Sequence, residues 1–315
     1  MSLCLVTGGA GFVGSHLVES LLNQGHSVRV LDNLRTGSEA NLVNVRRQID
    51  FVFGSVTDAN AVQAAMAGVE WVFHLAALPS VAQSVVDPIS IHEICATGTL
   101  RVLDAARQAG VRRVVYAASS SAYGDARKMP IREEAALAPL SPYGAAKLAG
   151  EHYCTAFTRT YGLETVRLRF FNIYGPRQDP HSPYAGVIPL FVTAMSAEES
   201  PTIFGDGTQT RDFVHVTDAV QALLLAAQVS GVAGSVFNIA WGKGTSISGL
   251  VRLLNRLLGK RIVPTLAPAR KGDILHSRAS IAAARHTLGY EPKIKLEEGL
   301  RHLVEGQGSS GRDRE

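Results

Sequence analysis

The stretch Thr7-Gly8-Gly9-Ala10-Gly11-Phe12-Val13-Gly14 follows a short apolar run at residues 3–7 and precedes a segment with helical spacing at residues 12–24. A strand, a glycine-rich turn and a helix in this order are typical of a turn that binds a pyrophosphate. Glycines allow the tight turn and let backbone N–H groups approach the phosphates, which then lie at the positive end of the helix. The predicted contacts are Gly8, Gly11, Phe12, Val13 and Gly14. A strand-to-helix turn without a ligand is the plain alternative.

Strands and helices continue to alternate through the first half of the chain, and further elements of both kinds are expected in the second half. Several runs are apolar on consecutive residues, which indicates strands buried on both faces, as in a parallel sheet covered by helices. We therefore expect an α/β protein: a Rossmann-type doubly wound parallel sheet with a smaller α/β substrate-binding domain. The expected strands are residues 28–32, 51–53, 71–76, 113–118, 165–170 and 235–240, and the expected helices are residues 12–24, 91–108, 142–161, 247–258 and 281–288.

A change in amino-acid composition after residue 172 divides the chain. Prolines recur between residues 176 and 201, which predicts a loop-rich stretch. We assign residues 1–172, with a return at about 212–240, to the dinucleotide-binding domain. Residues 173–211 and 241–305 are assigned to the substrate-binding domain, including the two helices expected after residue 246. Residues 306–315 are rich in glycine, serine and charge, which predicts a disordered tail.

Composition excludes several classes of protein. The 315 residues are 46% hydrophobic, enough for a sizeable core, and the formal net charge is +4. Cys4, Cys95 and Cys154 are too scattered for a disulfide framework and form no C-x-x-C pair, which fits a reducing cytoplasm. The apolar stretches are too short to cross a bilayer, and the basic residues are dispersed. We therefore expect no membrane insertion, no bound metal and no nucleic-acid partner.

Asp32 stands at the end of the second expected strand, near the distance from the glycine turn at which a carboxylate binds the adenine ribose. A carboxylate there accepts hydrogen bonds from both ribose hydroxyls and repels the 2'-phosphate of NADP. Asp32, with Asn33 beside it, therefore predicts NAD as the cofactor. The nearby Arg29 and Arg35 leave NADP open.

Tyr143 and Lys147 are four residues apart in the expected helix at residues 142–161, so that they share one helix face. A tyrosine phenol has an ordinary pKa of about 10, and an adjacent ammonium favours the phenolate. Lys147 can supply that ammonium while it binds the nicotinamide ribose, which allows Tyr143 to act as a base. The same spacing also occurs as a solvated pair on surface helices. Beside a dinucleotide motif, however, it favours catalysis.

Five linked motifs extend over most of the chain. They are Thr7-Gly8-Gly9-Ala10-Gly11-Phe12-Val13-Gly14, His74-Leu75-Ala76-Ala77, Ser119-Ser120-Ser121-Ala122-Tyr123-Gly124, Ser141-Pro142-Tyr143-Gly144-Ala145-Ala146-Lys147 and Arg169-Phe170-Phe171-Asn172-Ile173-Tyr174-Gly175-Pro176-Arg177. Together with residues 211–216 and 270–273 they resemble the NAD-dependent epimerase/dehydratase family, and within it the UDP-hexose 4-epimerases. The resemblance also implies a homodimer, in which residues 91–108 and 142–161 of both subunits form a four-helix bundle.

The same resemblance extends the predicted NAD contacts to the segments after the third and fourth strands. These contacts are Ser55, Val56, Leu75, Ala76 and Ala77. Three departures from the family pattern affect the NAD site. The family's usual Asp after Gly54 is Ser55, for which Asp58 could substitute, a usual Asn is Cys95, and a frequent Lys is Pro79. NAD is still implied, with an affinity that these changes affect.

Ser119 follows the fifth expected strand, where the family has its catalytic Ser or Thr, and its hydroxyl can relay a proton and orient the sugar O4. Sugar 4,6-dehydratases of the family have Asp and Glu where this chain has Ser120 and Ser121, and the related decarboxylases keep the Glu. Elimination needs those acids, so the resemblance implies only oxidation and re-reduction at C4. Tyr143 would remove the O4 proton while the C4 hydride passes to NAD. The 4-keto sugar would then rotate and receive the hydride on its other face.

Two arginines are predicted to bind the diphosphate of the substrate. Arg211 and Arg270 suit this role, because a guanidinium pairs with phosphate oxygens through two parallel donors. An ion pair with Asp212 or Asp273 is the alternative for either arginine. The resemblance also places Asn172 and Asp273 near the nucleotide-sugar. At least one of the serines at positions 120 and 121 could be only a turn residue.

Ser277 takes the place where epimerases restricted to unsubstituted hexoses have a bulky tyrosine. The small side chain predicts that UDP-GlcNAc and UDP-GalNAc are accepted besides UDP-glucose and UDP-galactose. A turn-capping role for Ser277 is the alternative.

Two other functions stay open from the sequence. The first is a nucleotide-sugar 4-ketoreductase, or an epimerase acting on a dTDP-, GDP- or CDP-sugar, because the contacts that distinguish the base are not located. The second is a non-catalytic dinucleotide sensor, against which the intact Tyr143, Lys147 and Ser119 argue.

Overall fold

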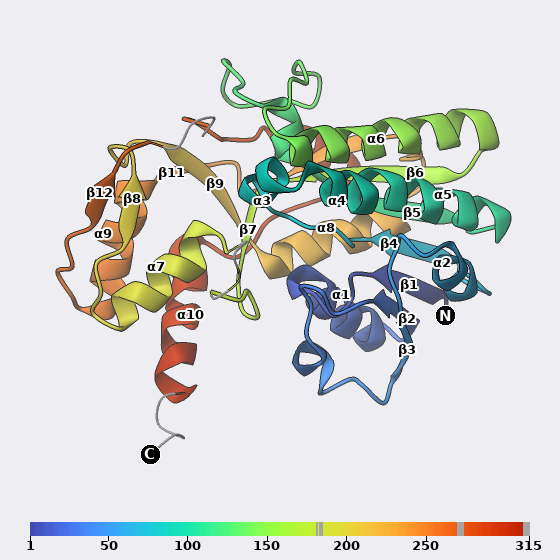
Figure 1. Cartoon of the computed structure of the whole chain (residues 1–315), viewed down its shortest axis with the longest axis horizontal. Coiled ribbons are helices and arrows are strands. Elements are labelled where there is room, and N and C mark those ends of the chain that lie inside the picture. The colour runs from blue at the N-terminus through green and yellow to red at the C-terminus, as the bar shows by residue number, and fades with distance from the viewer. Residues whose placement is uncertain (181, 183–184, 270–273, 311–315) are drawn as a thin grey trace.

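A seven-stranded parallel sheet forms the centre of the molecule (Figure 1). The computed structural model describes residues 1–180, 182, 185–269 and 274–310. The strands are, in sheet order, β10 (Val236–Ile239), β6 (Glu164–Phe170), β5 (Arg113–Ser119), β4 (Trp71–His74), β1 (Leu3–Thr7), β2 (Ser27–Asp32) and β3 (Ile49–Phe53). The 3-10 turns η1 (Glu39–Leu42) and η3 (Ser120–Tyr123) follow β2 and β5. Because the strand order reverses between β1 and β4, a crevice is expected at the carboxyl ends of these two strands.

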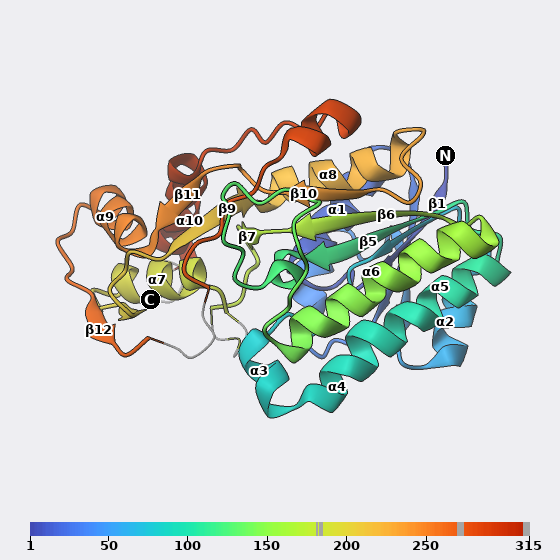
Figure 2. The ribbon, with the colours of Figure 1, turned by 90° about the horizontal axis from the view of Figure 1, so that it is seen from above.

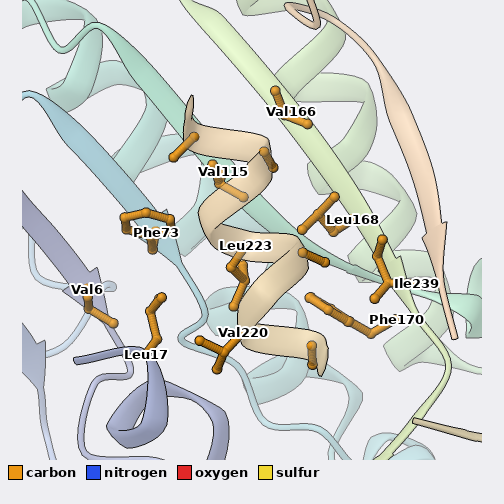
Figure 3. Packing of buried hydrophobic residues seen from close by; sticks show 14 of the residues in the cluster. Val6, Leu17, Phe73, Val115, Val166, Leu168, Phe170, Val220, Leu223 and Ile239 are labelled. Carbon is orange, nitrogen blue, oxygen red and sulfur yellow. The ribbon is translucent and has the colours of Figure 1, made fainter. Parts of the chain in front are cut away.

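Helices α1 (Phe12–Asn23) and α8 (Val216–Gln228) cover one face of this sheet. Leu17 of α1 belongs to the same buried cluster as Val6 of β1. Figure 3 shows Leu223 of α8 between Phe73 of β4 and Leu168 of β6. This face therefore buries apolar side chains from the centre of the sheet to its β6 side.

Helices α2 (Ala59–Ala65), α5 (Gly98–Gln108) and α6 (Pro142–Tyr161) cover the opposite face, and Figure 2 shows α5 and α6 side by side. Leu5 and Val72 belong to the cluster on this face, whereas their neighbours Val6 and Phe73 belong to the first cluster. Consecutive residues are thus buried on opposite faces, which explains the continuous apolar runs. The doubly wound parallel sheet is confirmed, and so is a helix over residues 142–161.

The helix expected at residues 91–108 is present, but it contains a π-helical turn. The segment around it contains α3 (Val81–Val86), α4 (Pro88–His92), the π-helical turn η2 (Glu93–Thr97) and then α5. A π-turn places an extra residue in the helix, which shifts the side chains that follow. Beyond it, a Cβ added to Gly98 would lie 2.8 Å from Cγ2 of Val56, so the helix passes very close to the strand ends. The apolar spacing does not reveal this insertion, because the spacing is compatible with an unbroken helix.

A smaller unit lies beside the carboxyl ends of the large sheet (Figure 1). It contains a three-stranded sheet of β11 (Gly244–Ser246), β9 (Thr210–His215) and β7 (Asn172–Tyr174), and a two-stranded sheet of β12 (Thr265–Ala267) and β8 (Thr202–Phe204). Its helices are α7 (Val187–Ser196), α9 (Ile247–Leu258) and α10 (Leu296–Ser310). The core of this unit includes Phe191, Met195 and Leu254. A smaller α/β unit is therefore present, as we expected, as a separate layer of structure.

Three boundaries differ from those expected. The return to the large sheet begins with α8, because β9 pairs with β7 and β11 in the small sheet. The π-helical turn η4 (Ala284–Leu288) packs in the cluster of α8 and the large sheet, not in the small unit. An amphipathic pattern shows that a segment has a buried face but not which core buries it. Helix α10 continues to Ser310, so residues 306–310 are helical where a disordered tail was expected.

The described residues show neither a membrane-spanning helix nor a metal-binding cluster. Within them, no helix is both long and apolar enough to cross a membrane. They also contain no group of three or more His, Cys, Asp or Glu side chains that could hold a metal ion. Cys4, Cys95 and Cys154 are buried free thiols.

Candidate active site

A cavity of about 1120 Å³ lies at the carboxyl ends of the sheet strands and extends to the small unit. Every predicted site residue that the structure describes lines it. These are Gly8, Gly11, Phe12, Val13, Gly14, Asp32, Asn33, Ser55, Val56, Leu75, Ala76, Ala77, Ser119, Ser120, Ser121, Tyr143, Lys147, Asn172, Arg211 and Ser277. Arg270 and Asp273 lie outside the described residues.

The glycine turn between β1 and α1 has no room for larger residues. A Cβ on Gly14 would lie 2.1 Å from the carbonyl oxygen of Gly8. Gly8 has a φ of +74°, and its Cβ would lie 2.8 Å from the backbone nitrogen of Ala76. Helix α1 begins after Gly11 without a side-chain cap, so the N–H groups of its first turn are left for another acceptor. The turn therefore fits the pyrophosphate of a dinucleotide.

Asp32 ends β2 beside this turn and is 8% exposed. Its Oδ2 accepts a hydrogen bond from the backbone N–H of Ala10 at 2.9 Å, and its Oδ1 accepts one from that of Leu34 at 2.8 Å. Burial raises the pKa of Asp32, while these hydrogen bonds act against the rise. The carboxylate is thus fixed at the cavity wall in the place suited to a ribose.

The two arginines that left NADP open differ in position. Arg29 pairs with Asp50 at 2.6 Å and donates to the carbonyl oxygens of Ala65 and Ala67. Its guanidinium is therefore directed to the far end of α2. Arg35, in contrast, lines the cavity. Of this pair, Arg35 is the residue that a 2'-phosphate could meet.

The departures from the family pattern also have distinct positions. Ser55 lines the cavity, and its hydroxyl shares a hydrogen bond of 2.8 Å with that of Thr57. Asp58 caps α2, where its Oδ1 accepts from two backbone N–H groups, so it does not substitute for the missing Asp. Pro79 lines the cavity. Cys95 is fully buried in η2, in a cluster that includes Tyr143.

Helix α6 presents Tyr143 and Lys147 to the cavity. It begins after Ser141, whose hydroxyl accepts from the N–H of Gly144 at 3.1 Å. The ammonium of Lys147 is buried, donates to the carbonyl oxygen of Ala117 at 2.9 Å, and lies 4.9 Å from the centre of the Tyr116 ring. Burial lowers the pKa of Lys147 and raises that of Tyr143. The pair therefore lies where little water reaches, so a charge placed nearby strongly changes the pKa of the phenol.

Ser119 lies at the end of β5 and lines the cavity with Tyr143, close enough for its hydroxyl to lower the pKa of the phenol. Its oxygen accepts from the N–H of Ser121 at 3.2 Å and from the hydroxyl of Ser121 at 2.8 Å. Neither of these bonds uses the hydroxyl hydrogen of Ser119, which can therefore stabilise a phenolate at Tyr143. Ser121 is thus partly occupied in forming the turn η3.

Asn172 and Arg211 face the cavity from the small sheet. The amide of Asn172 donates to the carbonyl oxygen of Asp212 at 3.3 Å. Arg211 donates to the carbonyl oxygens of Thr210 and Ile274 at 2.9 and 2.7 Å. Between Arg211 and Asp212, both described, there is no ion pair. The alternative partner of Arg211, Asp273, lies outside the described residues.

The carboxylate of Asp212 binds backbone N–H groups and not Arg211. It is fully buried and accepts from the backbone N–H groups of Trp241, Gly242 and Ala279 at 3.0 to 3.1 Å. Burial raises its pKa to about 6. Asp212 therefore ties its own strand β9 to the segments at residues 241–242 and 277–279. Ser277, 7% exposed, lies in the last of these segments and donates its N–H to the carbonyl oxygen of Thr210.

Sequence reasoning missed the wall formed after β7. Arg177, Gln178 and Asp179 line the cavity, and Arg177 pairs with Glu19 of α1 at 2.6 Å. In addition, Nε2 of His16 is 3.1 Å from the carbonyl oxygen of Pro176. These contacts hold the segment after β7 against the helix that begins at the glycine turn. The only signal in the sequence was the motif that ends at Arg177, and it did not indicate the partner on α1.

Comparison with known proteins agrees with the geometry of the site. The model of the NAD dependent epimerase/dehydratase family matches residues 4–240. A curated UDP-glucose 4-epimerase from Mycolicibacterium smegmatis is 41% identical over 96% of this chain and 97% of its own length. A UDP-glucose 4-epimerase structure from Thermotoga maritima, with UDP-glucose, has a TM-score of 0.93 at 40% identity, covering 98% of this chain and 99% of that one. A UDP-N-acetylglucosamine 4-epimerase from Methanobrevibacter ruminantium, in complex with UDP-N-acetylmuramic acid, has a TM-score of 0.93 at 37% identity with the same coverage.

Proposed function

The chain belongs to the NAD-dependent epimerase/dehydratase family, and on that premise we propose that it is a UDP-hexose 4-epimerase. It is an isomerase that interconverts the C4 epimers UDP-glucose and UDP-galactose through a transient 4-keto sugar. Its cofactor is NAD. The observation that carries the proposal is that Ser119, Tyr143 and buried Lys147 line the same cavity as the glycine turn.

The cofactor half of the cavity supplies the residues for NAD. The first turn of α1 would bind the pyrophosphate, and the Asp32 carboxylate, with Asn33 beside it, would accept from the adenine ribose. The remaining contacts would be Ser55, Val56, Leu75, Ala76, Ala77 and Lys147. When bound, the nicotinamide ring accepts the C4 hydride and returns it. Lys147, whose ammonium already donates to Ala117, has further N–H groups for the ribose hydroxyls.

Tyr143 would take the proton from the sugar O4 and later return it. Burial alone favours the neutral phenol, so the positive charge of Lys147 and the hydrogen bond from Ser119 are needed to stabilise the phenolate. The Tyr143 phenol therefore becomes a strong base only when the positive charges around it are in place. This supports proton transfer from O4 once the cavity is filled.

Hydroxyl groups at positions 120 and 121 argue against elimination. Removal of the C6 hydroxyl needs an acid to protonate the leaving group, and Ser120 and Ser121 line the cavity where the dehydratases have carboxyl groups. A serine hydroxyl is too weak an acid for that step. The chemistry supported by these side chains is therefore the reversible oxidation of C4.

The substrate half would hold the diphosphate and leave the sugar free to rotate. Arg211 is directed to this end of the cavity by two backbone carbonyls, and we assign it to the diphosphate together with Arg270. We assign Asn172 and Asp273 to the nucleotide-sugar. Ser277 leaves room at the cavity wall, which supports acceptance of UDP-GlcNAc and UDP-GalNAc. The similarity to an epimerase named for UDP-N-acetylglucosamine favours the same assignment.

We also propose a cytoplasmic homodimer. Val85, Val86 and Ile89, on and next to α3 and α4, are exposed apolar residues, as is Tyr153 on α6. A second copy of the chain that packs on these helices would cover them. The three free thiols fit a reducing compartment. Sedimentation at micromolar concentration would give twice the chain mass for a dimer and the mass of one chain otherwise.

The test is turnover without added cofactor. The purified protein is incubated with UDP-glucose, UDP-galactose, UDP-GlcNAc and UDP-GalNAc in turn, and the products are separated by chromatography. Each accepted substrate should give a mixture with its C4 epimer. Stoichiometric consumption of added NADH or NADPH would instead indicate a 4-ketoreductase. Retained NAD with no turnover of any nucleotide-sugar would indicate a non-catalytic sensor.

A further inference from the structure

His74, at the end of β4, is a buried histidine with no assigned role. It is 1% exposed and does not line the cavity. Both of its ring nitrogens have partners: Nδ1 is 2.7 Å from Oγ1 of Thr7, and Nε2 is 3.0 Å from Oγ1 of Thr99. Such complete pairing is expected of a buried polar side chain, because an unpaired nitrogen here would be costly.

The next contacts in the chain of hydrogen bonds decide which nitrogen of His74 carries the proton. Oγ1 of Thr99 donates its single hydrogen to the carbonyl oxygen of Cys95 at 2.7 Å, so it can only accept from Nε2 of His74. A neutral imidazole has one N–H, and Nδ1 must therefore accept from the hydroxyl of Thr7. The oxygen of Thr7 in turn accepts from the N–H of Ala76 at 3.3 Å. Each group in this chain thus donates to the next, from the N–H of Ala76 to the carbonyl of Cys95.

This chain connects two parts of the site that are far apart in the sequence. One end is Ala76, which lines the cavity and whose backbone nitrogen lies beside Gly8 of the phosphate turn. The other end is the carbonyl of Cys95 in the π-turn η2, which packs in the cluster that contains Tyr143. His74 therefore stands between the wall of the cofactor site and the helical segment beneath the catalytic tyrosine.

The surroundings of His74 also require a neutral ring. Tyr116 of β5 lies with its ring centre 5.7 Å away, and Lys147 of α6 is the cation that faces the imidazole. Burial, followed by the charge of Lys147, lowers the pKa of His74 to about 3. A second proton on the ring would lose the bond from Thr7 and add a positive charge next to Lys147.

We propose that His74 is a positioning residue of the active site: as a neutral imidazole protonated at Nε2, it fixes the carboxyl ends of β1 and β4 to the π-turn η2. The segment beside the phosphate turn and the π-turn η2, which packs in the cluster with Tyr143, are then held in a fixed relative position. His74 acts through Thr7 and Thr99 and touches neither cofactor nor sugar. The kinetic part of this inference rests on the proposed function, whereas the tautomer and the retention of NAD do not.

The tautomer is tested by nitrogen NMR of the full chain labelled at histidine. The expected spectrum between pH 6 and 8 has one histidine with a protonated Nε2 and an unprotonated Nδ1, and this signal pair disappears in the His74→Gln variant. A His74 ring that is protonated at Nδ1, or doubly protonated in this range, would overturn the proposal.

The positioning role is tested by Thr99→Val, with Thr99→Ser as the conservative variant. Thr155→Val is a matched control, because the hydroxyl of Thr155 also donates to the carbonyl four residues earlier and accepts a side-chain N–H, but lies outside the cavity lining. We expect Thr99→Val to lower kcat and the retention of NAD each about tenfold, and Thr99→Ser and Thr155→Val to keep both.

Equal kcat and equal NAD retention in Thr99→Val and Thr155→Val, with any loss confined to the melting temperature, would overturn the positioning role. If the wild-type protein shows no turnover at all, the proposed function fails. NAD retention and the nitrogen spectrum would still decide the role of His74.

Discussion

The two halves of the cavity are built in different ways. The cofactor half consists of strand ends, a glycine turn and backbone groups, so that Gly8, Gly14 and Asp32 lie within one strand-helix-strand unit. The substrate half is assembled from β5, β7, β9 and the segment before residue 279, which come from both units of the fold. A dinucleotide site of this kind is specified by local sequence, whereas the proposed sugar site depends on tertiary structure.

The largest effect is expected where the two halves meet. Tyr143→Phe removes the hydroxyl that we propose exchanges the O4 proton, while the ring keeps its place in the cluster with Cys95. We expect kcat to fall about ten-thousandfold, with unchanged retention of NAD and of UDP. Single-turnover kinetics with UDP-galactose measure the loss. A variant with more than a tenth of wild-type turnover would remove Tyr143 from the chemistry.

Acid titration of stability should give opposite signs in the two halves. His74 has an unfolded pKa of 6.5 and a folded pKa of about 3, so the unfolded chain binds its proton first. Stability from this group is complete above pH 6.5 and is lost as the pH falls toward 3, at about 1.4 kcal/mol per pH unit and about 5 kcal/mol in all. His74→Gln should therefore show a shallower loss of stability between pH 6 and 4 in urea titrations. An unchanged slope would contradict the buried neutral ring.

Asp212, in the substrate half, should act in the other direction. Its pKa rises from 3.8 in the unfolded chain to about 6 in the folded one. The folded protein then binds the proton first, so the contribution of this group to stability is complete below pH 3.8 and is lost as the pH rises through 6, by about 3 kcal/mol. Asp212→Asn removes this pH dependence. Urea titrations between pH 4 and 7 would show a steeper fall of stability toward pH 4 in the variant than in the wild type.

The cofactor half is broken most directly at the phosphate turn. In Gly14→Ala, the added Cβ would lie 2.1 Å from the oxygen of Gly8, so the turn must open. We expect NAD retention to fall about a hundredfold, because both the N–H cradle and the start of α1 are displaced. Gly306→Ala is the matched control, since nothing lies within 4 Å of the added Cβ in α10. NAD measured by absorbance after denaturation decides, and full retention in Gly14→Ala would contradict the assignment of the turn.

The smallest effect is expected from the wall of the sugar site. Ser277→Tyr fills part of the cavity next to Thr210. We expect kcat/KM for UDP-GlcNAc to fall about tenfold, while that for UDP-glucose stays within twofold. The unsubstituted sugar is thus the internal control. An equal fall for both substrates would show that position 277 does not select between them.

Much of the cofactor half could be predicted from the sequence for a physical reason. The glycine turn, Asp32 and the Tyr143/Lys147 pair are short-range patterns, and the helix at residues 142–161 has the predicted bounds because Ser141 caps it. The same holds in the small unit for the helix at residues 247–258, which Ser246 caps. Capping and apolar spacing are local properties of the chain. They are visible before the chain is folded.

The remaining features depend on partners that sequence spacing does not identify. The π-turn at Cys95 is linked to β1 and β4 through His74 and Thr99, and helical spacing gives no sign of it. The pairing of Arg177 with Glu19 joins residues 158 positions apart. Each of these needs the folded neighbour to be known.

In the proposed reaction one site removes the C4 hydride and returns it to the same carbon. UDP-galactose that carries deuterium at C4 can follow this transfer when it is incubated with the purified protein in ordinary water and without added cofactor. We expect UDP-glucose that keeps the deuterium at C4, measured by mass spectrometry and proton NMR. Loss of the deuterium to water, or conversion only after addition of NADH or NADPH, would contradict the proposed reaction.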